Sequence, residues 1–262
     1  MARILAISSQ VVYGSVGLSI ITPTLQSLAH DVMALPTVLF SNHPGHPQVA
    51  GTHISPETLS AMIEALAANG WLAGIDAVLS GYLPTAAHVA VVAATMRRLH
   101  QTKLALPYLC DPVIGDWPKG RYIADEAACA IRDQLLPLAT MLTPNAFELS
   151  WLTGHDIADE AAARSAILRL PAGLQTVATS VPMADGSPTL ANVIVADGQA
   201  RSVQVPKRTG VPHGTGDLLA ALLCGHVLNG HSFSAAVDLA VHDVDRRIAA
   251  SAGYDRLLIN AR

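Results

Sequence analysis

The stretch AVLSGYLPTAAHVAVVAATMRRLH, residues 77–100, contains the unit that decides the fold. It starts with a short apolar run at residues 77–80, which is typical of a buried β-strand. A glycine turn follows, and residues 85–100 then have the periodicity of an α-helix. A chain that alternates strands and helices in this way favours a parallel sheet that is covered by helices.

The alternation continues on both sides of this unit, and Asp197-Gly198 adds the signal of a tight β-hairpin. Strands are predicted at residues 3–8, 32–40 (with Pro36 weakening the middle), 104–110, 140–142, 176–180, 192–196 and 201–205. Helices are predicted at residues 18–29, 56–69, 125–136, 217–229 and 232–250. The predicted fold class is therefore α/β, with three α/β/α layers around a central, mainly parallel sheet.

Composition places the chain among folded, weakly acidic proteins. Of 262 residues, 51% are hydrophobic and 14% are charged, a balance that excludes intrinsic disorder. Lys and Arg number 16 and Asp and Glu 20, which gives a formal charge of −4. Nucleic acid is therefore not expected as a partner. Because no linker or repeat interrupts the pattern, residues 1–262 are expected to form a single domain.

No membrane partner is expected either, because the longest apolar stretches, such as residues 86–94, are too short to cross a bilayer. The N-terminal MARILAISS has the pattern of a first strand rather than of a signal peptide. Cys110, Cys129 and Cys224 show no CxxC spacing. This argues against a disulfide framework or a zinc site, and a cytoplasmic location is predicted.

Polar residues follow several predicted strands, at the edge where parallel α/β sheets bind ligands. These segments are residues 8–10, 41–47, 80–82, 111–116 and 143–148. In the second of them, His43 and His46 lack a carboxylate or cysteine at a ligand-like offset. A substrate-contacting loop is therefore favoured over a structural metal site.

Asp111 and Glu148 are the acids in these segments. Each has an ordinary structural alternative: Asp111 forms a turn, or Glu148 compensates a helix dipole. Two acids and two threonines at neighbouring strand ends are also suited to hold magnesium through oxygen atoms or water and to orient a polyphosphate.

The sharpest motif is Gly214-Thr215-Gly216-Asp217, directly before the apolar helical run LLAALLCGHVL. Its glycines expose backbone amides at a helix N-terminus, where the helix dipole also favours negative charge. Such an anion hole suits the oxygens of a transferring phosphoryl group. Asp217 has two candidate roles: it caps its own helix, or it accepts a proton from an alcohol that attacks phosphorus.

Two common nucleotide-binding signatures are absent from the sequence. It contains no GxxxxGK[ST], and no GxGxxG lies between the first predicted strand and helix. A P-loop fold and a dinucleotide-binding Rossmann domain are therefore disfavoured, so any ATP binding uses another architecture.

Six segments resemble those of pyridoxal kinases in their order and spacing. They are SSQVVYGSVG (8–17), TVLFSNHPGH (37–46), LSGYL (79–83), DPVIGD (111–116), TPNAFELSWLTG (143–154) and HGTGD (213–217). From about residue 3 to about residue 250 the chain resembles the bacterial pyridoxine/pyridoxal/pyridoxamine kinases of the ribokinase-like superfamily.

The resemblance implies ATP-dependent phosphorylation of a 5′-hydroxymethyl group on a pyridoxine-type molecule. It further implies Mg²⁺ as the cofactor, with a monovalent cation as a further candidate, and a homodimer. Asp217 is then the base that takes the proton from the alcohol, and the backbone of Gly214, Thr215 and Gly216 holds the transferring phosphate.

Further site residues follow from the same resemblance, by the matching positions. The implied substrate-binding residues are Ser9, Val16, His46, Tyr82 and Asp217. The implied ATP-binding residues are Asp111, Thr143, Glu148, Thr179, Val205, Pro206, Lys207, Arg208 and Thr215. Tyr122 and Glu148 are implied to lie near the metal.

Three positions depart from the family pattern. Leu18 stands where asparagine is common, which removes a polar group near the substrate pocket. Pro44 and Gly45 stand near the positions of a substrate-contacting His or Thr in relatives, so His46 is expected to substitute after a one-residue shift. His213 stands where some members have lysine, so the phosphate charge is expected to be met differently.

Two alternatives to a pyridoxal kinase stay open. A hydroxymethylpyrimidine kinase of the same fold also phosphorylates a flat heteroaromatic alcohol, although such enzymes often carry cysteine at the position of Asp217. A non-catalytic sensor of pyridoxal phosphate predicts binding without turnover. Its candidate Schiff-base lysines are Lys103, Lys119 and Lys207.

Overall fold

The computed structural model describes residues 1–259, so the last three residues of the predicted domain, 260–262, lie outside the described part. Eleven strands lie within it: β1 (Arg3–Tyr13), β2 (Asp31–Asn42), β3 (Gly51–His53), β4 (Ala77–Ser80), β5 (Tyr108–Cys110), β6 (Gly115–Asp116), β7 (Gly120–Arg121), β8 (Met141–Leu142), β9 (Gln175–Pro182), β10 (Thr189–Ala196) and β11 (Gln199–Pro206).

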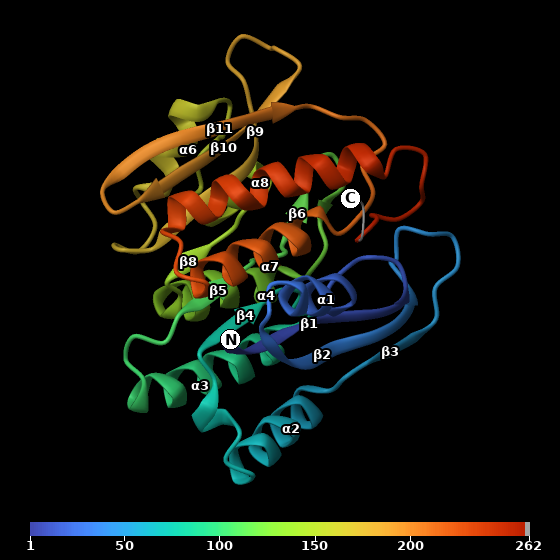
Figure 1. The fold of residues 1–262 in the computed structure, drawn as a ribbon, viewed down its shortest axis with the longest axis vertical. Helices are drawn as coiled ribbons and strands as arrows, with labels where there is room; N and C mark the ends of the chain where they lie inside the picture. The colour runs from blue at the N-terminus through green and yellow to red at the C-terminus, as the bar shows by residue number, and fades with distance from the viewer. Residues whose placement is uncertain (260–262) are drawn as a thin grey trace.

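In this part of the chain, nine strands form one sheet in the order β11-β10-β9-β8-β5-β4-β1-β2-β3 (Figure 1). The six strands from β9 to β2 in this order pair in parallel. Antiparallel pairing adds β3 at one edge and β10 and β11 at the other. Strands β6 and β7 form a separate small hairpin. The predicted mainly parallel α/β sheet is confirmed.

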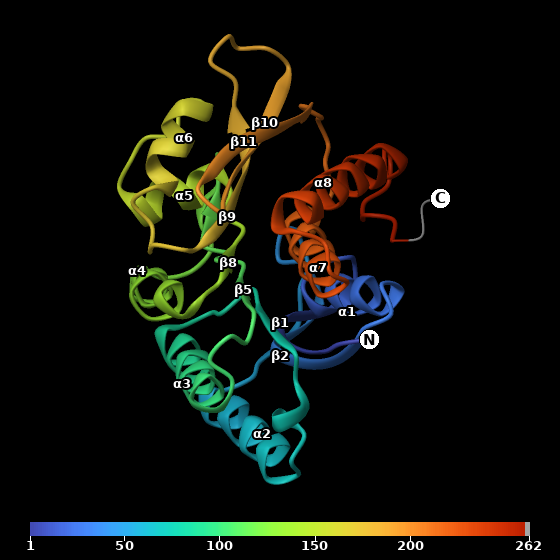
Figure 2. The ribbon, with the colours of Figure 1, turned by 60° about the vertical axis from the view of Figure 1, so that its left-hand side comes forward.

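The helices cover both faces of the sheet (Figure 2). Helices α1 (Leu18–Ser27), α7 (Thr215–Leu228) and α8 (Phe233–Ala250) lie on one face. On the other lie α2 (Pro56–Ala68), α3 (Ala86–Thr102), α4 (Asp125–Ala130), α5 (Ala146–Thr153) and α6 (Glu160–Ile167). Short turns of 3-10 or π helix add Leu72–Gly74, Ile131–Leu135 and Leu136–Leu138.

Strand β1 shows how the sequence directs side chains to both layers. Successive side chains of a strand point to opposite faces. Ile4 and Ala6 accordingly belong to the core of α1, α7 and α8, whereas Leu5 and Ile7 belong to the core of α2, α3 and α4. The apolar run at residues 4–7 is therefore buried on both sides, as the strands of parallel sheets are.

Several predicted boundary signals act as expected. The Ser55 hydroxyl accepts a hydrogen bond from the backbone N–H of Thr58, and Pro56 is the first residue of α2. Gly70, just after that helix, has a φ of 76°, which suits a helix stop. Asp197 and Gly198 both have positive φ and join β10 to β11 as a tight hairpin.

Other elements differ from the expected ones. The strand predicted at 104–110 begins only at Tyr108, after Pro107, and the helix predicted at 125–136 leaves the α geometry after Ala130. Pro36 does not interrupt β2, because β3 pairs only with residues 38–40 of that strand, and a proline is tolerated where no partner strand needs its N–H. Helix α6 and the two- and three-residue strands β3, β6 and β7 were not predicted.

Helix α7 is the central helix of its layer. Every residue from Leu218 to Gly225 is buried, because α7 is enclosed by α1, α8 and the sheet (Figure 2). A helix that is apolar all round fits only such an enclosed place. Its position is therefore held by packing on every side, and its N-terminus points to the carboxyl-end edge of the sheet.

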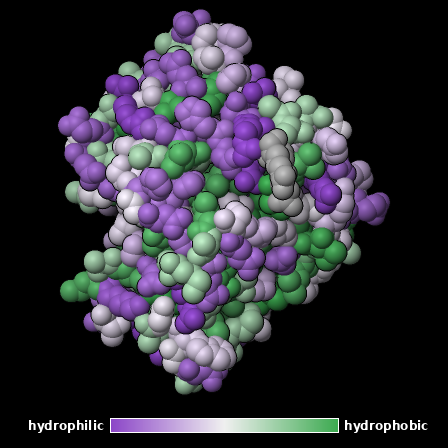
Figure 3. Space-filling view, viewed as in Figure 1, coloured by the Kyte–Doolittle hydropathy of each residue, from purple (hydrophilic) through white to green (hydrophobic). Residues whose placement is uncertain are grey.

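Hydrophilic and hydrophobic residues are interspersed over the face shown in Figure 3. Among residues 1–259, no helix combines the length and apolar character that a bilayer crossing requires. Cys110, Cys129 and Cys224 are all free thiols, as the sequence predicts.

The enclosed packing of α7 predicts a large cost for truncating one of its side chains. Leu223→Ala should lower the free energy of unfolding by about 2–5 kcal/mol, because Leu223 is fully buried and a cavity remains. Leu168→Ala is the matched control: this leucine is 75% exposed, and the change should cost under about 0.5 kcal/mol. Urea denaturation checks both, and equal losses would contradict the packing described.

Candidate active site

A cavity of about 920 Å³ lies at the carboxyl-end edge of the parallel strands. Its walls come from the ends of β1, β2 and β9, the loops after β4, β5 and β8, the β6–β7 hairpin, the segment before α7, and helices α7 and α8. The cavity therefore collects residues from nearly the whole length of the chain. This is the edge where parallel α/β sheets bind ligands.

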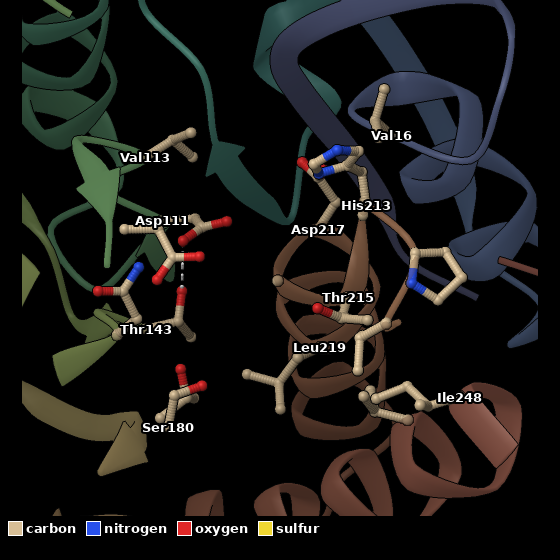
Figure 4. A pocket seen from close by; sticks show the side chains of 18 of the residues that line it. Val16, Asp111, Val113, Thr143, Ser180, His213, Thr215, Asp217, Leu219 and Ile248 are labelled. Carbon is tan, nitrogen blue, oxygen red and sulfur yellow. Dashed lines mark hydrogen bonds between the residues drawn. The ribbon is translucent and has the colours of Figure 1, made fainter. Parts of the chain in front are cut away.

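Two walls face each other across this cavity (Figure 4). One wall follows the strands β5, β8 and β9 and carries Asp111 and Thr143. The opposite wall is the first turn of α7, with Thr215, Asp217 and Leu219. An acidic wall thus faces a helix N-terminus, with room for a ligand between the two.

The turn before α7 is built on Gly214. Its φ is 99°, and a methyl group added there would lie 1.7 Å from the carbonyl oxygen of Ser15. Only glycine fits this position, so the turn packs directly on the backbone before α1. The first amides of α7 have no intrahelical acceptor, and together with the helix dipole they favour an anion at this end.

Asp217 lies in the first turn of α7, half-buried at the cavity wall. Burial raises the pKa of its carboxyl group to about 6, although a hydrogen bond from the backbone amide of Gly17 opposes this shift. Gly81 leaves space beside the carboxylate, since a methyl group there would lie 3.9 Å from Oδ1 of Asp217. The carboxylate therefore lies beside the Gly17 amide, directly before α1, and lines the cavity.

Asp111 and Glu148 lie buried on the strand-end wall. The Thr143 hydroxyl donates to Oδ1 of Asp111 at 3.1 Å. Burial raises the pKa of Asp111 well above its usual range, and the nearby carboxylates of Glu148 and Asp217 raise it further. Burial also raises the pKa of Glu148 to about 7. The wall therefore holds more negative charge than its protein neighbours compensate.

Glu148 is held in place by backbone amides. Its carboxylate accepts hydrogen bonds from Ile114 at 2.9 Å and from Asn145 at 2.9 Å. Asn145 in turn caps α5 by accepting from the Glu148 amide, which completes a capping box. These bonds favour the ionised carboxylate but do not cancel the effect of burial.

The structure brings most of the sequence-predicted site residues to this one cavity. Those that line it are Ser9, Val16, Tyr82, Asp111, Tyr122, Thr143, Glu148, Thr179, Val205, Pro206, Arg208, Gly214, Thr215, Gly216 and Asp217. His46 and Lys207 are not among the lining residues, whereas His43, Pro44 and Gly45 are. Leu18 is buried in the core of α1 and α7, away from the cavity surface.

Several lining residues were not singled out by the sequence. Asn145 had a readable signal, because Asn-x-x-Glu is a capping-box pattern. Asp245 had none: it pairs with Arg208 through two bonds of 2.8 and 3.0 Å, between residues 37 positions apart. Lys119, in the β6–β7 hairpin, also lines the cavity; the sequence named it only as one of three candidate Schiff-base lysines.

Comparison with known proteins identifies the family of the chain. The family model described as phosphomethylpyrimidine kinase matches residues 20–257. The chain is 35% identical over 238 residues to a pyridoxine/pyridoxal/pyridoxamine kinase of Bordetella avium, covering 90% of this chain and 80% of the relative. It is 32% identical to a pyridoxal kinase of Granulibacter bethesdensis, covering 99% and 94%.

The chain belongs to the pyridoxal kinase family. Solved structures of the family have the same fold. Pyridoxal kinase of Leishmania donovani, in complex with ADP and pyridoxine, has a TM-score of 0.91 and 31% identity, covering 98% of this chain and 92% of that one. A putative phosphomethylpyrimidine kinase of Bacteroides thetaiotaomicron, crystallised with pyridoxal, has a TM-score of 0.85 and 25% identity, covering 97% and 89%.

The Gly214 turn leads to a prediction with a matched control. Gly214→Ala and Gly230→Ala both place a side chain at positive φ, 99° and 93°, which costs about 1–2 kcal/mol. Only the side chain at position 214 would clash, with the carbonyl oxygen of Ser15, since the space around Gly230 is open. Urea denaturation should therefore show a clearly greater loss for Gly214→Ala. Equal losses would contradict the close packing on Ser15.

Proposed function

We propose that this chain transfers the γ-phosphoryl group of ATP to the 5′-hydroxymethyl group of pyridoxal, pyridoxine or pyridoxamine. The observation that carries the proposal is the position of Asp217, in the first turn of α7 and facing an acidic strand-end wall. Family membership supports it, because solved relatives hold ADP together with pyridoxine or with pyridoxamine.

Asp217 acts in this proposal as the general base. A carboxylate with a pKa of about 6 is mostly ionised at neutral pH and still accepts a proton readily. It takes the proton as the alcohol oxygen attacks the γ-phosphorus of ATP. The backbone amides of Gly214, Thr215 and Gly216 hold the phosphoryl oxygens, where negative charge is present throughout the transfer.

The two ends of the cavity suit the two substrates. Near Asp217, the lining residues Val16, Phe40 and Tyr82 present apolar and aromatic surface that fits a flat heteroaromatic ring. Further along, an apolar slot between β11 and the helices α7 and α8 fits a nucleoside; it is lined by Val205, Leu219, Val241, Val244 and Ile248. Ser9 is placed to hydrogen-bond the pyridine ring, and Thr179 and Arg208 to contact the nucleotide.

The strand-end wall fits a divalent cation that arrives with ATP. Glu148 raises the pKa of Asp111, and Asp116 raises that of Glu148; a cation near these carboxylates would relieve the repulsion. No group of three or more His, Cys, Asp or Glu side chains among residues 1–259 is arranged to hold a metal by itself. In the proposal, Glu148 and Tyr122 are the residues that would hold Mg²⁺ together with the phosphate oxygens of ATP. Magnesium bound there neutralises charge on the phosphate oxygens.

The cavity also bears on three further proposals. Its lining runs from Ser9 to Ile248, which supports one domain over residues 1–262.

For a non-catalytic sensor of pyridoxal phosphate, Lys119 is the one of the three candidate lysines that lines the cavity. A hydroxymethylpyrimidine kinase stays a second candidate, because the matching family model is described as phosphomethylpyrimidine kinase, which acts on a related pyrimidine. Assembly as a homodimer stays a prediction.

The decisive test is a coupled enzyme assay that measures the release of ADP. We expect turnover with at least one of pyridoxal, pyridoxine and pyridoxamine, and less with hydroxymethylpyrimidine. Asp217→Asn should lose about 100-fold or more in kcat, because the base is removed. Asp185→Asn, on the exposed β9–β10 loop away from the cavity, is the matched control and should keep full turnover.

Each other result has its own meaning. Full activity in Asp217→Asn would refute the assigned base. Turnover of hydroxymethylpyrimidine alone would favour the second candidate, and tight binding of pyridoxal phosphate without any turnover would favour a sensor.

A further inference from the structure

Two histidines from distant segments stack over the cavity. The rings of His43 and His213 are nearly parallel, with centroids 3.8 Å apart and planes inclined by 22°. His43 lies in the β2–β3 loop, and His213 directly precedes the Gly214 turn. Both line the cavity, and Figure 4 places His213 at the same end as Asp217 and Val16.

The geometry of the stack requires an uncharged His43 ring and excludes a charge on both rings. The backbone N–H of Gly45 donates to Nδ1 of His43 at 3.0 Å, so that nitrogen must carry a free lone pair. Two imidazolium rings at this separation would also repel each other. Gly45 itself is closely fitted, because a methyl group there would lie 2.9 Å from a nitrogen of each ring.

The charged groups that act on the stack are basic. Lys119 of the β6–β7 hairpin and His46 lower the pKa of both rings, in addition to burial; that of His43 falls to about 4. The acids that line the same cavity are Asp111, Asp116, Glu148, Asp217 and Asp245. None of these acids is among the groups that shift either histidine. Four basic side chains, those of His43, His46, Lys119 and His213, therefore lie close to one another.

We propose that His43 and His213 form a clamp that senses the phosphorylated product. With an uncharged alcohol bound, the neutral rings stay stacked and hold the β2–β3 loop over the substrate end of the cavity. With a phosphate monoester at the Gly214 turn, the rings take up a proton from solvent, unstack and release the loop. This inference rests on the proposed function, and it assigns the clamp to product release.

The physical reason is the change of charge at one place. A phosphate monoester carries about −1.5 to −2 charges at neutral pH, whereas the hydroxymethyl group carries none. Negative charge near an imidazole favours its protonated form. A protonated Nδ1 no longer accepts from Gly45, so the hydrogen bond and the stack are lost together. The same event turns one of the two neutral rings into a cationic contact for the phosphate.

Proton uptake on binding is the direct test. Pyridoxal 5′-phosphate is titrated calorimetrically into the whole protein at pH 6.5, in two buffers of different ionisation enthalpy. The double variant His43→Asn, His213→Phe keeps an acceptor for Gly45 and an aromatic ring but cannot take up the proton. We expect the wild-type protein to absorb about one proton more per ligand than this variant. Unphosphorylated pyridoxal should show no such difference.

The chain offers a matched control in a second histidine pair. His226 and His231 lie edge to face at 5.6 Å and are not among the cavity-lining residues. His231→Phe should leave proton uptake at the wild-type value. If the double variant does not fold, His213→Phe alone serves, with a loss of at least half of the extra uptake expected.

Two results would overturn the clamp: equal proton uptake in the wild-type protein and the double variant, or no binding of pyridoxal 5′-phosphate at millimolar concentration. The proposed kinase function fails in a different way. Binding with the extra proton but no turnover of any alcohol would leave the clamp in place and remove the kinase assignment.

Discussion

The contact between Gly214 and the carbonyl oxygen of Ser15 fixes where α7 begins, and the rest of the site depends on that point. Helix α7 is buried on all sides, so it cannot shift along its axis without disturbing α1, α8 and the sheet. The glycine turn then sets Asp217 three residues into the helix, where the Gly17 amide holds its carboxylate. The packing of the core on one side of the sheet thus determines where the carboxylate of Asp217 lies.

The charged side chains are distributed unevenly along the cavity. Carboxylates gather at the strand-end wall, and basic side chains gather at the mouth near Gly214. In a partly buried space such groups interact more strongly than they would in water. The cavity therefore suits a ligand that brings its own cation to one end and its own negative charge to the other, as a metal-bound nucleotide and a phosphorylated product do.

The sequence predicted the layered fold and several of the residues that line the cavity, because these rest on local patterns. Alternating apolar runs and helical periods identified the parallel strands, and Ser55-Pro56 and Asp197-Gly198 marked a helix start and a hairpin. The polar residues after β5 and β8 and the motif before α7 were readable since each lies within a few consecutive residues. The family resemblance supplied the rest of the predicted site residues.

What could not be predicted depends on contacts between distant segments. The very short strands β3, β6 and β7 have no periodicity of their own and form only against their partners. The Arg208–Asp245 pair and the His43–His213 stack join segments that the sequence gives no reason to connect. His46 was expected to replace the missing loop residue, but His43 lines the cavity instead. The path of the loop, rather than residue spacing, decides which histidine faces inward.

The pH dependence of kcat/KM for pyridoxal, at saturating ATP, tests the role of Asp217 most directly. Its carboxyl has a pKa of about 6 in the free protein, and a general base must be ionised to act. The rate should be constant above pH 7 and should fall as pH drops through about 6, approaching tenfold per unit. The residual activity of Asp217→Asn should lack this acidic limb. A wild-type rate that stays constant down to pH 5, or an acidic limb unchanged in Asp217→Asn, would contradict the account.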